Sequence, residues 1–261
     1  MNKTMIYQVE KICQDHFSKL ADRDFFKRMW QQPQEKYLQR LKQLDFVNKE
    51  NVLDAGSGFG QWSFALSKLN HNVEGIEYDM NRVNACNELM QELDTKNVNF
   101  TNGELENMPY LDNQFDAVFC FGVLMCTDFK KSIKEIRRVL KPGGMFFFNS
   151  SDLGWFLYNI LENNNSSVDF SPRNWAMDSI KHTIDYFSLD VYNKKGNENL
   201  IIPQNLMIEH LKLEGFNIFD FGKQGTCKIK DGPFFDINRP EKRYGFIDTY
   251  EVICHKKKSN E

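Results

Sequence analysis

The sequence lacks any long uninterrupted apolar run, and this absence limits the kind of protein it encodes. Of its 261 residues 41% are hydrophobic, but no stretch approaches the roughly 18 apolar residues that a membrane-spanning helix needs. The first residues, MNKTMIYQVEKICQDHF, carry charges where a signal peptide has an apolar block. We therefore expect a soluble, globular, cytoplasmic protein without a membrane span.

Closely spaced cysteines and an excess of basic residues are also missing. The six cysteines lie far apart, without a C-x-x-C pair or a histidine cluster, so the sequence contains no recognisable zinc site and no disulfide framework. Scattered cysteines of this kind are typical of a reducing cytoplasm. The formal net charge is -3, from 33 Lys and Arg against 36 Asp and Glu. This balance argues against DNA binding by bulk charge and weakens an interpretation as an RNA-binding protein.

Residues 51–151 alternate between short apolar runs and helical patterns. Such alternation predicts a doubly wound, Rossmann-like α/β sheet with parallel strands. The expected strands are Asn51–Ala55, Asn72–Tyr78, Val98–Thr101, Phe115–Phe121 and Met145–Asn149, and the expected helices between them are Gln61–Leu69, Met80–Leu93 and Phe129–Leu140.

The segments on either side of this core differ in character. Residues 1–48 have helical periodicity, which Pro33 divides, and predict an N-terminal helical cap to the core at 49–151. Residues 152–202 are irregular, with a helix start expected at Ser171-Pro172. Regular structure returns over 203–257, with a helix at Gln204–Glu214 and strands at Phe216–Phe221 and Tyr244–His255. We expect one domain, residues 1–261, in which 152–202 is an insertion.

The sharpest motif is the glycine loop Asp54-Ala55-Gly56-Ser57-Gly58-Phe59-Gly60, which follows a strand and precedes a helix. Its G-x-G-x-G spacing differs from the G-x-G-x-x-G of dinucleotide binders. Asp54 adds a negative charge that would repel a pyrophosphate and attract an ammonium or sulfonium group. The loop therefore indicates a cationic nucleoside ligand without phosphate.

The acidic residue Glu77 lies at the end of the second expected strand. There it is placed to accept hydrogen bonds from both ribose hydroxyls of such a ligand. Tyr78 follows and is positioned to lie against the base. Taken alone, Glu77 is equally well explained as a surface or helix-capping acid. The glycine loop in register with it favours the binding role.

With these motifs the sequence resembles the class I S-adenosylmethionine-dependent methyltransferases, of the type 11-like kind. The resemblance covers residues 50–150 and 203–255. The motifs that carry it are the glycine loop, Glu77, Asn102–Pro109, Asn113–Val118, Glu135–Gly144 and Leu213–Phe216. It implies a mostly parallel seven-stranded sheet whose last strand is antiparallel.

The resemblance also implies a cofactor, S-adenosylmethionine, which leaves as S-adenosylhomocysteine, and a set of contacts to it. Asp54 and the loop residues Gly56, Ser57, Gly58 and Gly60 would hold the methionine part, and Glu77 the ribose. Glu104, where the family commonly has Asp, would accept from the adenine amino group, and the Leu105 N–H would face the ring. Phe121 would contact cofactor or acceptor.

The acceptor is expected to be selected by the aromatic-rich segment 152–202, which would act as a lid. Trp155, Tyr158, Arg173 and Trp175 are the candidate acceptor-binding residues, although these aromatics would equally well pack a helix pair onto the sheet. A hydroxyl acceptor needs a general base, and His182 is the first candidate because imidazole titrates near neutral pH, although a core or solvated histidine is the more common case. Tyr186 and Asp152 are further candidates. Arg239 and Arg243 are placed to bind an anionic acceptor or to lie at the surface.

The function expected from all of this is methyl transfer from S-adenosylmethionine to an oxygen or nitrogen of a small-molecule or glycan-like acceptor. The alternatives are a noncatalytic cofactor-binding scaffold of the same fold and an RNA methyltransferase. A nicotinamide-dependent oxidoreductase is disfavoured by the loop spacing and by Asp54. No metal ligand set is expected.

Overall fold

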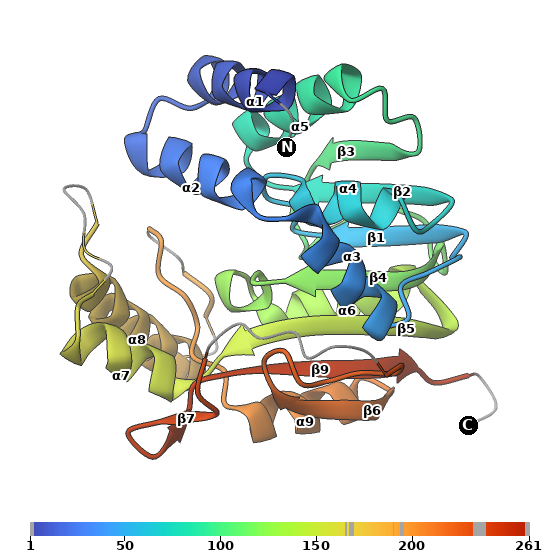
Figure 1. Ribbon diagram of the computed structural model, residues 1–261. Helices are drawn as coiled ribbons and strands as arrows, with labels where there is room; N and C mark the ends of the chain where they lie inside the picture. Colours follow the sequence, from blue (N-terminus) through green and yellow to red (C-terminus); the bar gives the residue numbers. More distant parts are fainter. Residues whose placement is uncertain are drawn as a thin grey trace.

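The structure is a computed structural model that describes residues 3–164, 166, 170–189, 191–193, 196–231 and 239–258. In this part of the chain, seven strands form one sheet in the order β3-β2-β1-β4-β5-β9-β6, and two short strands form a separate hairpin, β7-β8 (Figure 1). The strands are β1 (Asn51–Ala55), β2 (Asn72–Glu77), β3 (Val98–Asn102), β4 (Phe115–Phe121), β5 (Leu140–Ser151), β6 (Phe216–Lys223), β7 (Lys242–Arg243), β8 (Phe246–Ile247) and β9 (Thr249–Lys256).

The pairing confirms the predicted doubly wound, mostly parallel sheet. Strands β1 to β5 are mutually parallel, whereas β9 runs antiparallel to both β5 and β6. From β1 the chain winds outward to β2 and β3, and later returns to the other side of β1 through β4. Ligands in such sheets bind where this winding reverses, outside the carboxyl ends of the strands.

Helices cover both faces of the sheet (Figure 1). Helices α1 to α5 pack in a core cluster with Val52, Phe119 and Phe147, while α6, α8 and α9 share the other cluster with Phe146 and Phe148. Adjacent residues of β5 face opposite sides, as the period of a strand requires. The helices are α1 (Lys3–His16), α2 (Leu20–Gln31), α3 (Gln34–Gln43), α4 (Gln61–Ser67), α5 (Met80–Glu92), the 3-10 turn η1 (Leu124–Cys126), α6 (Phe129–Val139), α7 (Leu153–Leu161), α8 (Pro172–Leu189) and α9 (Gln204–Leu213).

Two predicted boundaries were wrong. Strand β5 begins at Leu140 rather than Met145, because Leu140 pairs with Phe115 across an irregularity and so extends the strand through the expected turn. The last strand begins at Thr249 rather than Tyr244, because Tyr244 and Gly245 have φ of 52° and 84° and turn the separate β7-β8 hairpin.

Segment 152–202 packs partly into the core of the protein. It contains α7, α8 and an extended stretch, and its residues Tyr186, Leu200 and Ile202 belong to the core cluster beneath the sheet. Helix α8 begins at Pro172, as expected. Residues 165, 167–169, 190, 194 and 195 of this segment lie outside the described residues.

Candidate active site

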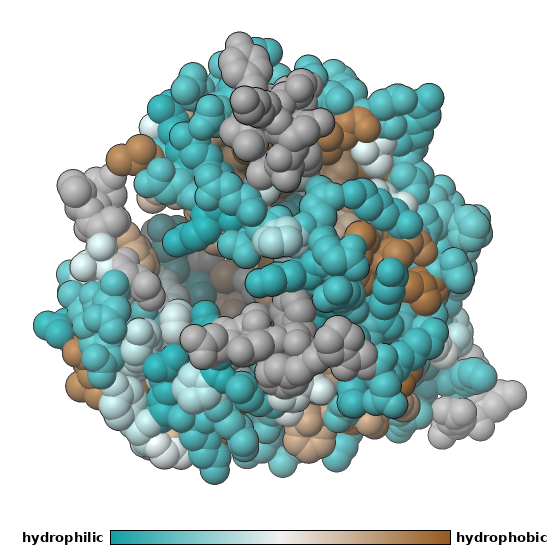
Figure 2. Space-filling view, in the orientation of Figure 1, coloured by the Kyte–Doolittle hydropathy of each residue, from teal (hydrophilic) through white to brown (hydrophobic). Residues whose placement is uncertain are grey.

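A cavity of about 1410 Å³ opens at the carboxyl ends of the parallel strands. In Figure 1 these ends point toward the side where α2 and α8 lie, and Figure 2 shows a hollow there, bordered mainly by hydrophilic residues. Small-molecule sites usually occupy roughly 300 to 1,000 Å³, so the cavity is large enough for two ligands side by side. Its walls come from α2 and α3, the loops after β1 to β4, and Tyr192, Gly196, Asn197 and Asn199.

The glycine loop after β1 forms the floor of one end. Gly56 has φ of 83°, and a Cβ there would come within 2.4 Å of Val123 Cγ2, so only glycine lets the two loops meet. Gly56 and Ser57 each donate their N–H to the Ile76 carbonyl (2.9 Å), which ties the loop to β2. Gly58 has φ of 57° and open space where its side chain would be. The loop is therefore a backbone surface that a ligand can approach closely.

Glu77 lies against this loop at the cavity wall. Its carboxylate is 5% exposed, and it accepts the Gly58 N–H at Oε2 (3.0 Å) and the Asp79 N–H at Oε1 (3.1 Å). Burial raises its pKa, while Arg82, 3.7 Å away, opposes that rise. Each oxygen keeps a lone pair for a further donor. Tyr78 lines the cavity beside Glu77 with its side chain 68% exposed.

Asp54 and Gly60 are placed differently from the expectation, because neither lines the cavity. Asp54 is 2% exposed and lies beneath the loop, where Oδ2 accepts the Ser63 hydroxyl (2.5 Å). Burial raises its pKa to about 7. Gly60 directly precedes α4, and its φ of 79° lets the chain turn into that helix.

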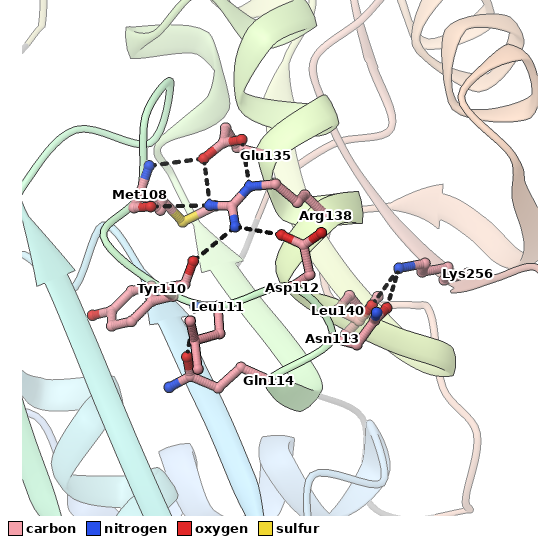
Figure 3. A network of polar contacts seen from close by, with 10 residues as sticks. All are labelled: Met108, Tyr110, Leu111, Asp112, Asn113, Gln114, Glu135, Arg138, Leu140 and Lys256. Atoms are coloured by element: carbon pink, nitrogen blue, oxygen red, sulfur yellow. Dashed lines mark hydrogen bonds and ion pairs between the residues drawn. The ribbon is translucent and has the colours of Figure 1, made fainter.

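The loop after β3 carries the predicted adenine contacts, and both Glu104 and Leu105 line the cavity. A guanidinium group on α6 fixes this loop. Arg138 donates to the carbonyls of Met108 (3.0 Å) and Tyr110 (2.7 Å), and forms ion pairs with Glu135 and Asp112 (Figure 3). These bonds hold the loop against α6 from the side opposite the cavity.

Two buried polar atoms at the cavity wall have no hydrogen-bond partner among the described residues. They are Ser57 Oγ, on a residue 3% exposed, and Gln61 Oε1, at the start of α4. Unsatisfied buried polar atoms are costly unless a ligand or water pairs with them. Together with the glycine surface and Glu77, they fit S-adenosylmethionine, whose amino-acid and ribose groups supply the missing partners.

The cavity also has an aromatic wall, of which the sequence indicated only Phe121. Tyr37 of α3 packs edge-on to Trp62 of α4 (4.6 Å between ring centroids), and Trp62 packs against Phe121 (5.2 Å). Phe25 and Met29 of α2 continue the wall. The aromatic spacing of α2 and α3 was visible in the sequence, but nothing there indicated that these helices reach the carboxyl ends of the strands.

Most of the predicted acceptor-side residues do not line the cavity. The rings of Trp155 and Tyr158 stack on each other. The Arg239 guanidinium lies over the Trp155 ring, 3.9 Å from its centroid, and the Arg243 guanidinium lies over the Tyr158 ring, 4.0 Å from its centroid. These contacts join α7 to the β7-β8 region, so the helix-packing alternative describes them better. Arg173 donates to the Ile160 carbonyl and Trp175 to the Asn197 carbonyl. Cavity residues of 152–202 are instead Tyr192, Gly196, Asn197 and Asn199.

The candidate bases also lie behind the cavity rather than in it. The Tyr186 hydroxyl donates to Asp128 Oδ1 (2.9 Å), and its ring is buried in the core. The His182 ring is buried and packs edge-on against Tyr192, 5.4 Å between centroids. Asp152 caps two helices, accepting the Leu153 N–H (2.6 Å) and the Gln204 N–H (2.9 Å). Packing and capping account for all three.

Three broader features bear on the class of site. No grouping of His, Cys, Asp or Glu that could hold a metal ion occurs within the described ranges. All six cysteines are free thiols, and only Cys126 is more than marginally accessible, at the cavity wall. No helix among the described residues is long and apolar enough to cross a membrane.

Comparison with known proteins agrees with this geometry. Residues 47–201 match a family described as methyltransferase domain. Demethylmenaquinone methyltransferase of Staphylococcus saprophyticus is 32% identical over 109 residues, which are 40% of this chain and 46% of that protein. The match thus spans less than half the length of this relative.

Solved structures share the fold. Geranyl diphosphate methyltransferase in complex with S-adenosylmethionine has a TM-score of 0.58 at 15% identity, covering 85% of each chain. The cyclase SpnF also has a TM-score of 0.58, at 16% identity, covering 87% of this chain and 81% of its own. At such identities the likeness concerns the fold alone, and the family match carries the assignment. The chain belongs to the methyltransferase domain family, as a class I S-adenosylmethionine-dependent methyltransferase.

Proposed function

We propose that this protein transfers a methyl group from S-adenosylmethionine to an oxygen or nitrogen of a small, ring-containing acceptor. The observation that carries the proposal is that one cavity has two different ends. Glu77 and the glycine loop form one end, and the ring wall of Tyr37, Trp62 and Phe121 forms the other. A cofactor and an acceptor bound there would meet between the two ends.

The cofactor end is suited to the nucleoside and amino-acid parts of S-adenosylmethionine. Glu77 would accept from the ribose hydroxyls, Glu104 and the Leu105 N–H would meet the adenine, and Ser57 and Gln61 would pair with the amino-acid group. When bound, the cofactor supplies an activated methyl group on a positively charged sulfur. The protein's remaining task is to align the acceptor with it and to exclude water.

The acceptor end favours a planar apolar group. Phe25, Met29, Tyr37, Trp62 and Phe121 present rings and a thioether to the cavity, and such surfaces gain free energy by covering apolar area. Aromatic walls also stack on sugars, so a glycan-like acceptor is the second candidate. The relatives named for demethylmenaquinone support a ring-containing acceptor.

Labelled methyl transfer tests the proposal. The full chain would be incubated with methyl-labelled S-adenosylmethionine and, separately, 2-naphthol, 2-naphthylamine, reduced demethylmenaquinone and methyl glucoside. Label is expected in a methyl ether or N-methyl product of a ring-containing probe, and Trp62→Ala should lower kcat/KM for it while leaving S-adenosylhomocysteine affinity unchanged. Label in methyl glucoside alone would replace the ring acceptor with a glycan. Cofactor binding without any transfer would favour the noncatalytic scaffold.

A further inference from the structure

One face of α8 is hydrogen-bonded to every second residue of an extended segment, residues 196–202, which we call the strap. The three bonds run from Trp175 Nε1–H to the Asn197 carbonyl (2.8 Å), from the Asn199 N–H to Ser179 Oγ (3.0 Å) and from the Ile201 N–H to Thr183 Oγ1 (2.9 Å). Residues four apart share a helix face, and alternate residues of an extended chain share a side. Helix α8 therefore fixes the register of the strap.

The two hydroxyl groups in this pairing are oriented by the helix itself. Ser179 donates to the Trp175 carbonyl (2.8 Å), and Thr183 donates to the Ser179 carbonyl (2.7 Å). Each hydroxyl proton is thus engaged, and an oxygen lone pair is left for a strap N–H. Loss of either hydroxyl would leave a partly buried N–H of the strap without its acceptor.

The strap presents two carboxamides to the cavity. Asn197 and Asn199 both line it. On its other side the strap is held by the Leu200 N–H, which donates to the Met125 carbonyl (2.7 Å), and by the Cys126 thiol, which donates to Asn199 Oδ1 (3.3 Å). Neither carboxamide nitrogen donates to another of the described residues, so both retain donors for a ligand.

The charges around this edge disfavour a negatively charged group. Glu106 and Asp128 line the same part of the cavity, joined by the Asp128 N–H, which donates to Glu106 Oε1 (2.8 Å). Lys131 lies 3.3 Å from Asp128 and is largely exposed. Burial, with Glu106 and Asp128 nearby, raises the pKa of the Tyr192 hydroxyl beside the strap. An anion would lose hydration there and meet carboxylates.

We propose that Asn197 and Asn199 form an amide edge that recognises an uncharged hydrogen-bonding group on the acceptor, such as a phenolic hydroxyl, and that Ser179 and Thr183 are positioning residues for that edge. The proposal deepens the proposed function and rests on it. It assigns the ring of the acceptor to the Trp62 wall and its polar group to the strap.

Two probes with one ring system and different charge test the edge without requiring turnover. Calorimetry would measure binding of 2-naphthol and 2-naphthoate to the full chain saturated with S-adenosylhomocysteine. We expect 2-naphthol to bind about tenfold or more tightly than 2-naphthoate, whose carboxylate meets Glu106 and Asp128, a difference of about 1.4 kcal/mol.

Conservative variants separate recognition from folding. Asn199→Asp keeps the shape and the acceptor oxygen for Cys126 but replaces the amide donor with a charge, and should weaken 2-naphthol binding about tenfold. Thr183→Val keeps the shape but removes the hydroxyl, and should weaken it about threefold or more. Both should leave S-adenosylhomocysteine affinity unchanged. Thr226→Val, at an exposed turn where the hydroxyl bonds the Lys223 carbonyl, is the matched control.

The outcomes distinguish the two proposals. If S-adenosylhomocysteine does not bind, the proposed function fails. If it binds, but 2-naphthoate equals 2-naphthol or both Asn199→Asp and Thr183→Val bind 2-naphthol like the parent, the amide edge is overturned and the methyltransferase assignment stands.

Discussion

At the scale of single residues, two buried carboxyl groups lie on either side of the glycine loop and have different tasks. Glu77 faces the cavity and accepts hydrogen bonds from two backbone N–H groups, whereas Asp54 lies beneath the loop and accepts one from the Ser63 hydroxyl. Both pKa values are raised, mainly by burial. Only Glu77 can reach a ligand directly, so Asp54 acts on the site through the loop it supports.

Replacing Glu77 tests its direct role. Glu77→Ala should weaken S-adenosylhomocysteine binding by about 1 to 3 kcal/mol, because the ribose hydroxyls lose a charged acceptor. Calorimetry would measure the change in Kd. Glu74→Ala, on the same strand but outside the cavity lining, is the control and should bind normally. An unaltered Kd for Glu77→Ala would refute the ribose assignment.

Replacing Asp54 tests its buried state through the pH dependence of stability. The folded pKa is about 7, against an ordinary value of 3.8, so between these values the native state binds more protons than the unfolded state. Stability from this group therefore falls as pH rises through that window. Asp54→Asn removes the titration. Relative to the parent, the variant should gain about 2 to 4 kcal/mol on going from pH 5 to pH 8, measured by urea unfolding at both pH values. A pH-independent difference would contradict the buried assignment.

The closeness of the glycine loop and Glu77 could be predicted from sequence because the spacing within the loop is local. Gly56, Ser57 and Gly58 fall within one turn after a strand, and Glu77 ends the neighbouring parallel strand, so pairing brings them together. The acceptor residues could not, because an aromatic at helical spacing identifies a packed face without saying what the face covers. Trp155 and Tyr37 have similar sequence settings, yet only Tyr37 lines the cavity.

At the scale of elements, the loop after β3 depends on α6. Arg138 donates hydrogen bonds to two carbonyls of that loop and pairs with two carboxylates. Its ion pair with Glu135 lowers the pKa of Glu135 and raises the pKa of Arg138. The loop has little regular structure of its own, so this one side chain holds much of its geometry. Glu104 and Leu105 lie a few residues before Met108 and Tyr110, whose carbonyls accept these hydrogen bonds.

Removing this guanidinium should therefore affect binding as well as stability. Arg138→Met should cost about 1 to 3 kcal/mol of folding free energy, because carbonyls and carboxylates lose a charged donor. It should also weaken S-adenosylhomocysteine binding, since the adenine contacts are no longer held. Urea unfolding and calorimetry would measure the two effects. Arg137→Met, at the exposed neighbouring position of α6, should change neither. Normal binding in Arg138→Met would mean that the loop is positioned without α6.

Element boundaries were predictable where one strand ends in a turn and not where pairing extends it. Strands β1 and β4 have the expected limits, because a glycine, Gly56 or Gly122, follows each of them. Strand β5 extends through Lys141–Gly144, since its partner Phe115 offers a position for Leu140. The hydrophobic periodicity of a segment reflects its local preference for a strand. The length of the strand also depends on its pairing partner, which lies far away in the sequence.

At the scale of the whole molecule, the two ends of the chain are joined behind the acceptor wall. Arg40 of α3 is 3% exposed and Glu251 of β9 is 1% exposed, and they form an ion pair of 2.5 Å. Arg40 also donates to the Cys227 carbonyl (2.7 Å), and Glu251 accepts the Cys227 N–H (2.7 Å). Nothing in the local sequence indicates that α3 meets β9. The position of Tyr37, one turn before Arg40, follows from that contact.

A double-mutant cycle on this pair tests whether the chain ends act as one unit. Arg40→Met leaves the Glu251 carboxylate buried without its cation, and Glu251→Gln leaves Arg40 without its anion. Each should cost about 3 to 5 kcal/mol. The double variant buries no unpaired charge, so it should cost less than the sum, with a coupling of about 1 to 3 kcal/mol by urea unfolding. Because Tyr37 moves with α3, the double variant should also bind 2-naphthol more weakly than the parent while retaining S-adenosylhomocysteine affinity. Additive costs with unchanged 2-naphthol binding would show that β9 does not position the acceptor wall, and α3 would then be held by its apolar contacts alone.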